Sequence, residues 1–157
     1  MNRRAVLCAV IVAGSSLLCG PASAQPSDAP TAIKTSDAPL PIGPFSQAVS
    51  VGPLVYLSGQ IGLDPATGQL VTGGTDVEAR RAMANLGAVL KAAGLTFGNV
   101  VKTTIYLTDI TDFGKVNAAY AEFFTSGTPP ARATVGVASL VRGAHVEIEM
   151  VAVRQRY

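Results

Sequence analysis

The run His145-Val146-Glu147-Ile148-Glu149-Met150 alternates apolar and polar residues, as a half-buried β-strand does. The two glutamates, Glu147 and Glu149, fall on one face of this strand and the apolar residues between them fall on the other. From Met150 onward, the sequence Met150-Val151-Ala152-Val153 is apolar on both faces. A strand covered on both faces needs more than one layer of helices, so we expect a second subunit on its far side.

A lone arginine follows a double proline in the sequence Pro129-Pro130-Ala131-Arg132. Each proline ring fixes φ and restricts the residue before it, so Arg132 sits on rigid backbone. Its planar guanidinium can hold a carboxylate through two charge-assisted hydrogen bonds. If the strands around Arg132 and Glu147 pair, the two side chains would line one pocket that binds a small carboxylate and activates a water. The alternative interpretation is an ordinary surface arginine and the solvent face of an amphipathic strand.

The remaining sequence predicts the other elements of one α+β domain. Strands are expected at 49–51, 54–57, 100–107, 133–137 and 146–153, and helices from Thr75 to Ala93 and from Thr111 or Asp112. Thr75 and Glu78 match a helix capping box, in which each side chain bonds the other residue's backbone N–H. This order predicts a mixed sheet with two helices packed on one face.

The first 24 residues are predicted to be a secretory signal peptide. Asn2-Arg3-Arg4 is a positive start, an apolar stretch follows from Ala5 to Leu18, and Ala22-Ser23-Ala24 has the pattern of a cleavage site. Cleavage near Ala24 predicts a periplasmic or secreted protein with no stable membrane anchor. Acylation at Cys19 is the alternative.

A flexible lead-in is expected at 25–40, because that segment is rich in Pro, Ala, Ser and Asp. The folded domain is expected to cover 41–157, the length of one ordinary domain.

Charge and composition exclude several classes of function. Cleavage of the signal peptide removes Arg3 and Arg4, which lowers the number of Lys and Arg residues from 12 to 10, equal to the 10 Asp and Glu residues. A chain with no net charge is a poor nucleic-acid binder. Both cysteines, Cys8 and Cys19, also leave, so thiol chemistry and disulfides are not expected. His145 is the only histidine in the sequence, so a metal site would need oxygen ligands alone. A Ser-His-Asp triad would have to use this histidine, and no nucleophile-elbow motif supports one.

Several motifs, in order, resemble those of the Rid family. The resemblance is carried by Ile42-Gly43-Pro44-Phe45-Ser46-Gln47-Ala48, Leu57-Ser58-Gly59-Gln60-Ile61, Pro130-Ala131-Arg132 and Val146-Glu147-Ile148-Glu149. It extends from about Pro41 to Arg154, nearly the whole expected domain.

The resemblance implies a chorismate-mutase-like fold that assembles as a homotrimer with ligand clefts between subunits. It also implies metal-independent, cofactor-free hydrolysis of 2-imino acids, of the 2-iminobutanoate/2-iminopropanoate type, to 2-keto acids and ammonia. By position, Arg132 would hold the substrate carboxylate and Glu147 would act on the hydrolytic water. The other implied cleft positions are Phe45, Ser58, Gly59, Asn117 and Thr134.

Two of these positions differ from the deaminase subgroup, because Phe45 and Thr134 stand where tyrosine and cysteine are typical. A non-enzymatic binder of small carboxylates, or a chaperone-like trimer, is therefore an alternative function. Endoribonuclease or translation-inhibitor activity, another label in this family, fits a neutral exported chain poorly.

Overall fold

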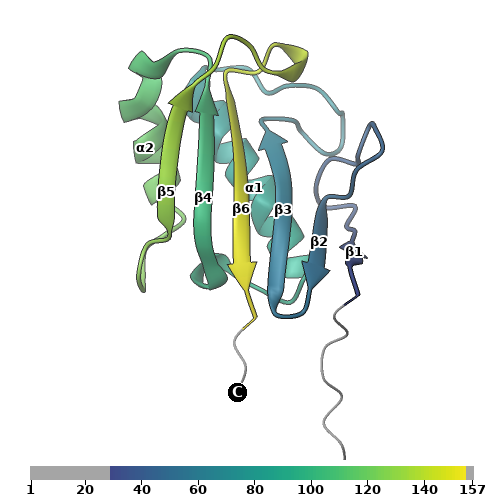
Figure 1. The fold of residues 1–157 in the computed structure, drawn as a ribbon. Helices are drawn as coiled ribbons and strands as arrows, with labels where there is room; N and C mark the ends of the chain where they lie inside the picture. Colours follow the sequence, from purple (N-terminus) through teal and green to yellow (C-terminus); the bar gives the residue numbers. More distant parts are fainter. Residues whose placement is uncertain (1–28, 155–157) are drawn as a thin grey trace, which may run out of the picture.

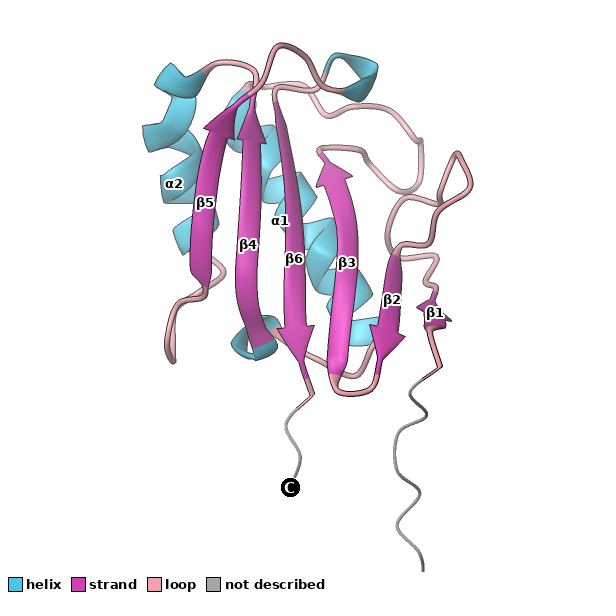
Figure 2. Cartoon of the chain, in the orientation of Figure 1, coloured by secondary structure: helices cyan, strands magenta, loops and turns pink. Residues whose placement is uncertain are grey.

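The computed structural model describes residues 29–154, and the predicted signal peptide lies outside them (Figures 1 and 2). Six strands form one sheet in the order β1-β2-β3-β6-β4-β5. Only the β4–β5 pair is parallel, so the sheet is mixed. The strands are β1 Thr31–Ile33, β2 Ala48–Val51, β3 Leu54–Ile61, β4 Val100–Leu107, β5 Ala131–Gly136 and β6 Val146–Val153. The helices are α1 Thr75–Ala92 and α2 Phe113–Ala121, with short 3-10 turns at η1 Phe97–Asn99, η2 Ile110–Asp112 and η3 Val141–Gly143.

Both α-helices pack against the same face of the sheet, which confirms the predicted arrangement (Figure 1). The alternation in β6 sends Val146, Ile148, Met150 and Ala152 into the core beneath these helices. Burial of this apolar face is the main favourable term in folding. Neither α-helix in residues 29–154 is long and apolar enough to cross a membrane.

The other face of the sheet is not covered by any helix of residues 29–154 (Figure 2). Tyr56 of β3 and Val135 of β5 are exposed on it, and Val151 and Val153 of β6 are only half-buried. A face of this kind commonly marks an interaction surface. The predicted partner subunit on this side stays a prediction.

The folded region begins earlier than the sequence predicts. Strand β1 pairs with β2, and the segment after it is held by Gln47, which is 1% exposed. The Gln47 amide accepts the Thr35 backbone N–H at 2.8 Å and donates to the carbonyls of Ala38 and Pro39 at 3.2 and 2.9 Å. Residues 29–40 are therefore not the flexible lead-in that their composition predicts. Strand β1 is paired, and the buried Gln47 amide satisfies backbone groups in the segment that follows it.

The predicted capping box at the start of α1 is also wrong. The N-cap is Gly74, and the Thr75 hydroxyl, one residue later, donates to Asp112 at the start of α2. Glu78 accepts the backbone N–H of His145 at 2.8 Å and contacts its Nδ1 at 2.6 Å. Both side chains make tertiary bonds in place of local ones, and these bonds fasten α1 to α2 and to the residue before β6.

Candidate functional site

Glu147 lies over the backbone of the neighbouring strand at Gly59. Glu147 is paired with Ile61 of β3, and the register shifts between Leu57 and Gln60. A Cβ atom at Gly59 would overlap the Oε1 atom of Glu147. Glycine is therefore required where β3 passes under this carboxylate, because any side chain would displace it.

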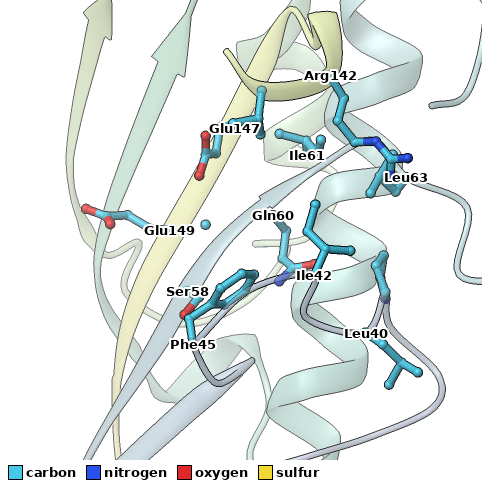
Figure 3. A pocket seen from close by; sticks show the side chains of 13 residues that line it. Leu40, Ile42, Phe45, Ser58, Gln60, Ile61, Leu63, Arg142, Glu147 and Glu149 are labelled. Carbon is cyan, nitrogen blue, oxygen red and sulfur yellow. The ribbon is translucent and has the colours of Figure 1, made fainter. Parts of the chain in front are cut away.

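The Glu147 carboxylate faces a cavity of about 480 Å³ (Figure 3). Phe45, Ser58, Gly59 and Glu149 line the same cavity. The Ser58 hydroxyl donates to the carbonyl of Ser46 at 2.7 Å, which fixes its orientation and leaves its oxygen free to accept a bond. Four predicted site residues thus meet in one cavity, namely Phe45, Ser58, Gly59 and Glu147.

The electrostatics of this cavity favour a proton-accepting carboxylate. Burial raises the pKa of Glu147, and the nearby charge of Glu149 raises it further. Glu149 accepts a hydrogen bond from the Tyr106 hydroxyl at 3.0 Å. Burial and this carboxylate raise the pKa of Tyr106, so the phenol remains the donor. A base with a pKa nearer neutrality exchanges protons more effectively near physiological pH.

Arg132 is oriented by three residues of α2. Its Nη2 donates to Asn117 Oδ1 at 2.8 Å, and its guanidinium lies 4.7 Å from the Tyr120 ring centroid and 5.8 Å from that of Phe113. Such stacking fixes the guanidinium plane. No carboxylate within residues 29–154 forms an ion pair with Arg132. Its remaining N–H groups can therefore hold an external carboxylate.

Arg132 and Glu147 do not meet within one chain. Arg132 is aligned with Thr103 and Thr134 with Ile105, which places both on the helix-covered side of the sheet. Glu147 is aligned with Tyr106 on the opposite side. Their strands do not pair, because β4 lies between β5 and β6, so the condition for a shared pocket within one chain is not met.

The cavity also contains residues that sequence reasoning did not select. Glu149 shares the face of Glu147 in the alternating run, a pattern that could have identified it. Leu40 and Ile42 come from the segment before β2 and Val141 from the turn η3; Ile42 begins a family motif, whereas no local pattern marks the other two. In the described part of the chain, no three His, Cys, Asp or Glu side chains cluster as metal ligands would.

This fold defines a chorismate-mutase-like α+β domain, with a cavity lined by residues of its inner strands β3 and β6. The chain belongs to the Rid family, because the family model described as Endoribonuclease L-PSP matches residues 35–154.

Three relatives illustrate the relationship. The mouse protein named 2-iminobutanoate/2-iminopropanoate deaminase is 57% identical over 112 residues, which cover 71% of this chain and 82% of the mouse protein. YyfA from Yersinia pestis is described as a protein of unknown function of the conserved Rid family. Its structure matches with a TM-score of 0.78 and 44% identity, and the match covers 80% of this chain and 99% of the YyfA chain. The structure of TdcF from E. coli with bound serine matches with a TM-score of 0.76 and 39% identity, and the match covers 80% of this chain and 99% of the TdcF chain.

Proposed function

We propose that this protein hydrolyses 2-imino acids to 2-keto acids and ammonia, using Arg132 and Glu147 and neither a metal nor a cofactor. The observation that carries this proposal is the half-buried Glu147 carboxylate, held over Gly59 in a cavity wide enough for a small molecule. The 57% identity to a mouse protein named as a deaminase of 2-imino acids supports it.

The site is completed between two copies of the chain. Arg132 lies on the helix side of the edge strand β5, whereas Glu147 lies on the open side of the sheet. Packing of one copy against the open face of the next would place the Arg132 of one beside the Glu147 of the other. Each contact joins two different surfaces, and three such contacts can close a ring. The homotrimer implied by the family resemblance fits this requirement.

Arg132 binds the carboxylate of the substrate in this assembly. Asn117 and the Tyr120 ring already orient its guanidinium, so little rotational freedom is lost when the substrate binds. The relative TdcF from E. coli has been solved with bound serine, an amino acid.

Glu147 moves the protons of the reaction. A water oxygen bonds to the electrophilic iminium carbon while the C=N π pair moves onto nitrogen, and Glu147 accepts the proton that this water releases. The protonated Glu147 then gives that proton to the nitrogen of the carbinolamine. The C–N bond breaks, the hydroxyl becomes the keto oxygen, and its proton leaves with ammonia as ammonium. No covalent intermediate with the protein is needed.

We also propose that the protein is exported, with cleavage near Ala24. The first 24 residues support export, because they have a positive start, an apolar stretch and a small-residue end, as secretory signal peptides do. Fractionation of expressing bacteria, followed by N-terminal sequencing of the mature chain, tests it. A mature protein that begins at Met1 in the cytosolic fraction would refute export.

The test of the enzymatic proposal is keto-acid release from imines made in place by an amino-acid oxidase. We expect the wild-type protein to accelerate release over the oxidase alone, and Arg132→Ala to lower kcat/KM by at least about a hundredfold. Arg81→Ala is the matched control, since Arg81 makes only a long 3.7 Å ion pair with Asp64. If the wild type gives no acceleration but small carboxylates raise its thermal stability, the protein is a binder and the proposal fails.

A further inference from the structure

One wall of the Glu147 cavity is built from apolar side chains that a soluble chain rarely exposes together. Leu40 is 70% exposed, Ile42 is 76% exposed and Val141 is 63% exposed. The first two lie before strand β2 and the third lies in the turn before β6, so distant segments of the chain converge on the same cavity. Figure 3 shows Leu40 and Ile42 on the side of the cavity away from the two glutamates.

The cavity of one copy, before a second copy contributes Arg132, exceeds what the smallest imino acids would fill. Its volume of about 480 Å³ falls within the range of roughly 300–1,000 Å³ in which proteins bury drug-sized ligands. The side chain of 2-iminopropanoate is a single methyl group and would leave most of the apolar wall in contact with water. A larger apolar side chain would cover that wall and gain the free energy of its burial.

The charges around the cavity disfavour a polar or acidic side chain. Arg142 is the one cation among the lining residues, and its Nη1 donates to the carbonyl of Gly68 at 3.2 Å. Figure 3 shows its guanidinium extending away from Glu147. Glu147 and Glu149 are the other charged groups that this chain contributes to the cavity, and both would repel an acidic side chain, while the Arg132 of the second copy is occupied by the substrate carboxylate.

We propose that this protein prefers 2-imino acids with large apolar side chains, of the leucine or phenylalanine type, over those with a methyl or ethyl side chain. This inference rests on the proposed function. Leu40, Ile42 and Val141 set the preference, because they contact the part of the substrate farthest from the reacting carbon. Their contribution appears in kcat/KM, the quantity by which an enzyme discriminates between substrates.

The experiment compares imines generated from leucine, alanine and glutamate by amino-acid oxidases, with each rate measured as acceleration over the oxidase alone. We expect kcat/KM to be about tenfold or more higher for the leucine-derived imine than for the alanine-derived imine. The glutamate-derived imine should be the poorest substrate. The double variant Leu40→Ala/Val141→Ala should lower the leucine-to-alanine ratio about tenfold.

Ile110→Ala is the matched control, because Ile110 is a 51% exposed apolar residue away from this cavity. It should leave the ratio unchanged, and thermal unfolding should show all variants folded. Equal rates for leucine and alanine, or a ratio that the double variant does not change, would overturn the preference while the proposed function stands. Failure to accelerate any imine would overturn both.

Discussion

The carboxylate of Glu78 binds His145 through two contacts, one with the backbone N–H at 2.8 Å and one with the ring Nδ1 at 2.6 Å. The Glu78 side chain is 3% exposed, whereas the imidazole is largely open to solvent. The pair connects α1 to the residue that precedes β6, two positions before Glu147. It therefore anchors the strand that carries the proposed base.

Replacement of His145 by alanine should destabilise the fold. The variant keeps the backbone hydrogen bond but leaves one buried oxygen of Glu78 without a partner, at a cost of about 1–3 kcal/mol in the free energy of unfolding. Urea denaturation measures this loss. Lys115→Ala is the control, since the exposed Lys115 side chain pairs with Asp112 across the start of α2 and its loss should cost clearly less. Equal losses in the two variants would show that the Glu78–His145 contact adds nothing.

The charge of Glu149 should shift the pH dependence of activity. Hydrolysis requires ionised Glu147, so the rate should fall as the pH drops through the pKa of this group. Burial and the Glu149 charge raise that pKa, so the fall begins at a higher pH than for a free glutamate. Glu149→Gln removes one of the two causes and should move the acidic limb of kcat/KM to lower pH. An unchanged limb would mean that another group controls it.

The same shift has a consequence for stability. Because folding raises the pKa of Glu147, the folded state disfavours its ionised form, and stability is lost as the pH rises through the folded pKa. Glu147→Gln should therefore be more stable than wild type above that pKa. The difference should shrink as the pH falls and vanish below the unfolded pKa. Thermal unfolding across this pH range measures it, and a variant less stable at neutral pH would contradict it.

Gly59→Ala should damage the site more than the fold. The added methyl group overlaps the Glu147 carboxylate, so this side chain must rotate away from the cavity. We expect kcat/KM to fall about a hundredfold and stability to fall by about 1–3 kcal/mol. Gly114→Ala is the control, because a Cβ at Gly114 of α2 meets no atom within 4 Å. Wild-type activity in Gly59→Ala would show that the position of the Glu147 carboxylate is unimportant.

Local sequence patterns predicted most of the helices and strands but not which strands lie side by side in the sheet. The alternation of Glu147 and Glu149 with apolar residues correctly assigned the two faces of β6, because side-chain direction in a strand follows from its period of two. The pairing of β6 with β4 depends on tertiary packing, and no periodicity near Arg132 indicates it. The residue pattern therefore left open whether the strands of Arg132 and Glu147 pair, and in the sheet they do not.

Long-range hydrogen bonds explain the other differences. Gln47 lies in a motif typical of the family, yet its role of holding residues 35–39 appears only in the folded chain. Glu78 has the spacing of a capping residue but binds a histidine 67 positions away. Four members of the cavity were predictable because family motifs carry them. Ile42 of the apolar wall also lies in such a motif, but Leu40 and Val141 do not, and loop residues leave no periodic pattern.

In the proposed ring, the separation of Arg132 and Glu147 on opposite faces of one chain means that two defective genes could complement each other. A ring of Arg132→Ala chains has no intact site, and neither has a ring of Glu147→Gln chains. A mixed ring would contain junctions in which one copy supplies a sound arginine and its neighbour a sound glutamate, at roughly a quarter of the junctions after equal mixing. Recovery of activity on co-refolding two inactive preparations would be a direct sign that each reaction centre belongs to two molecules.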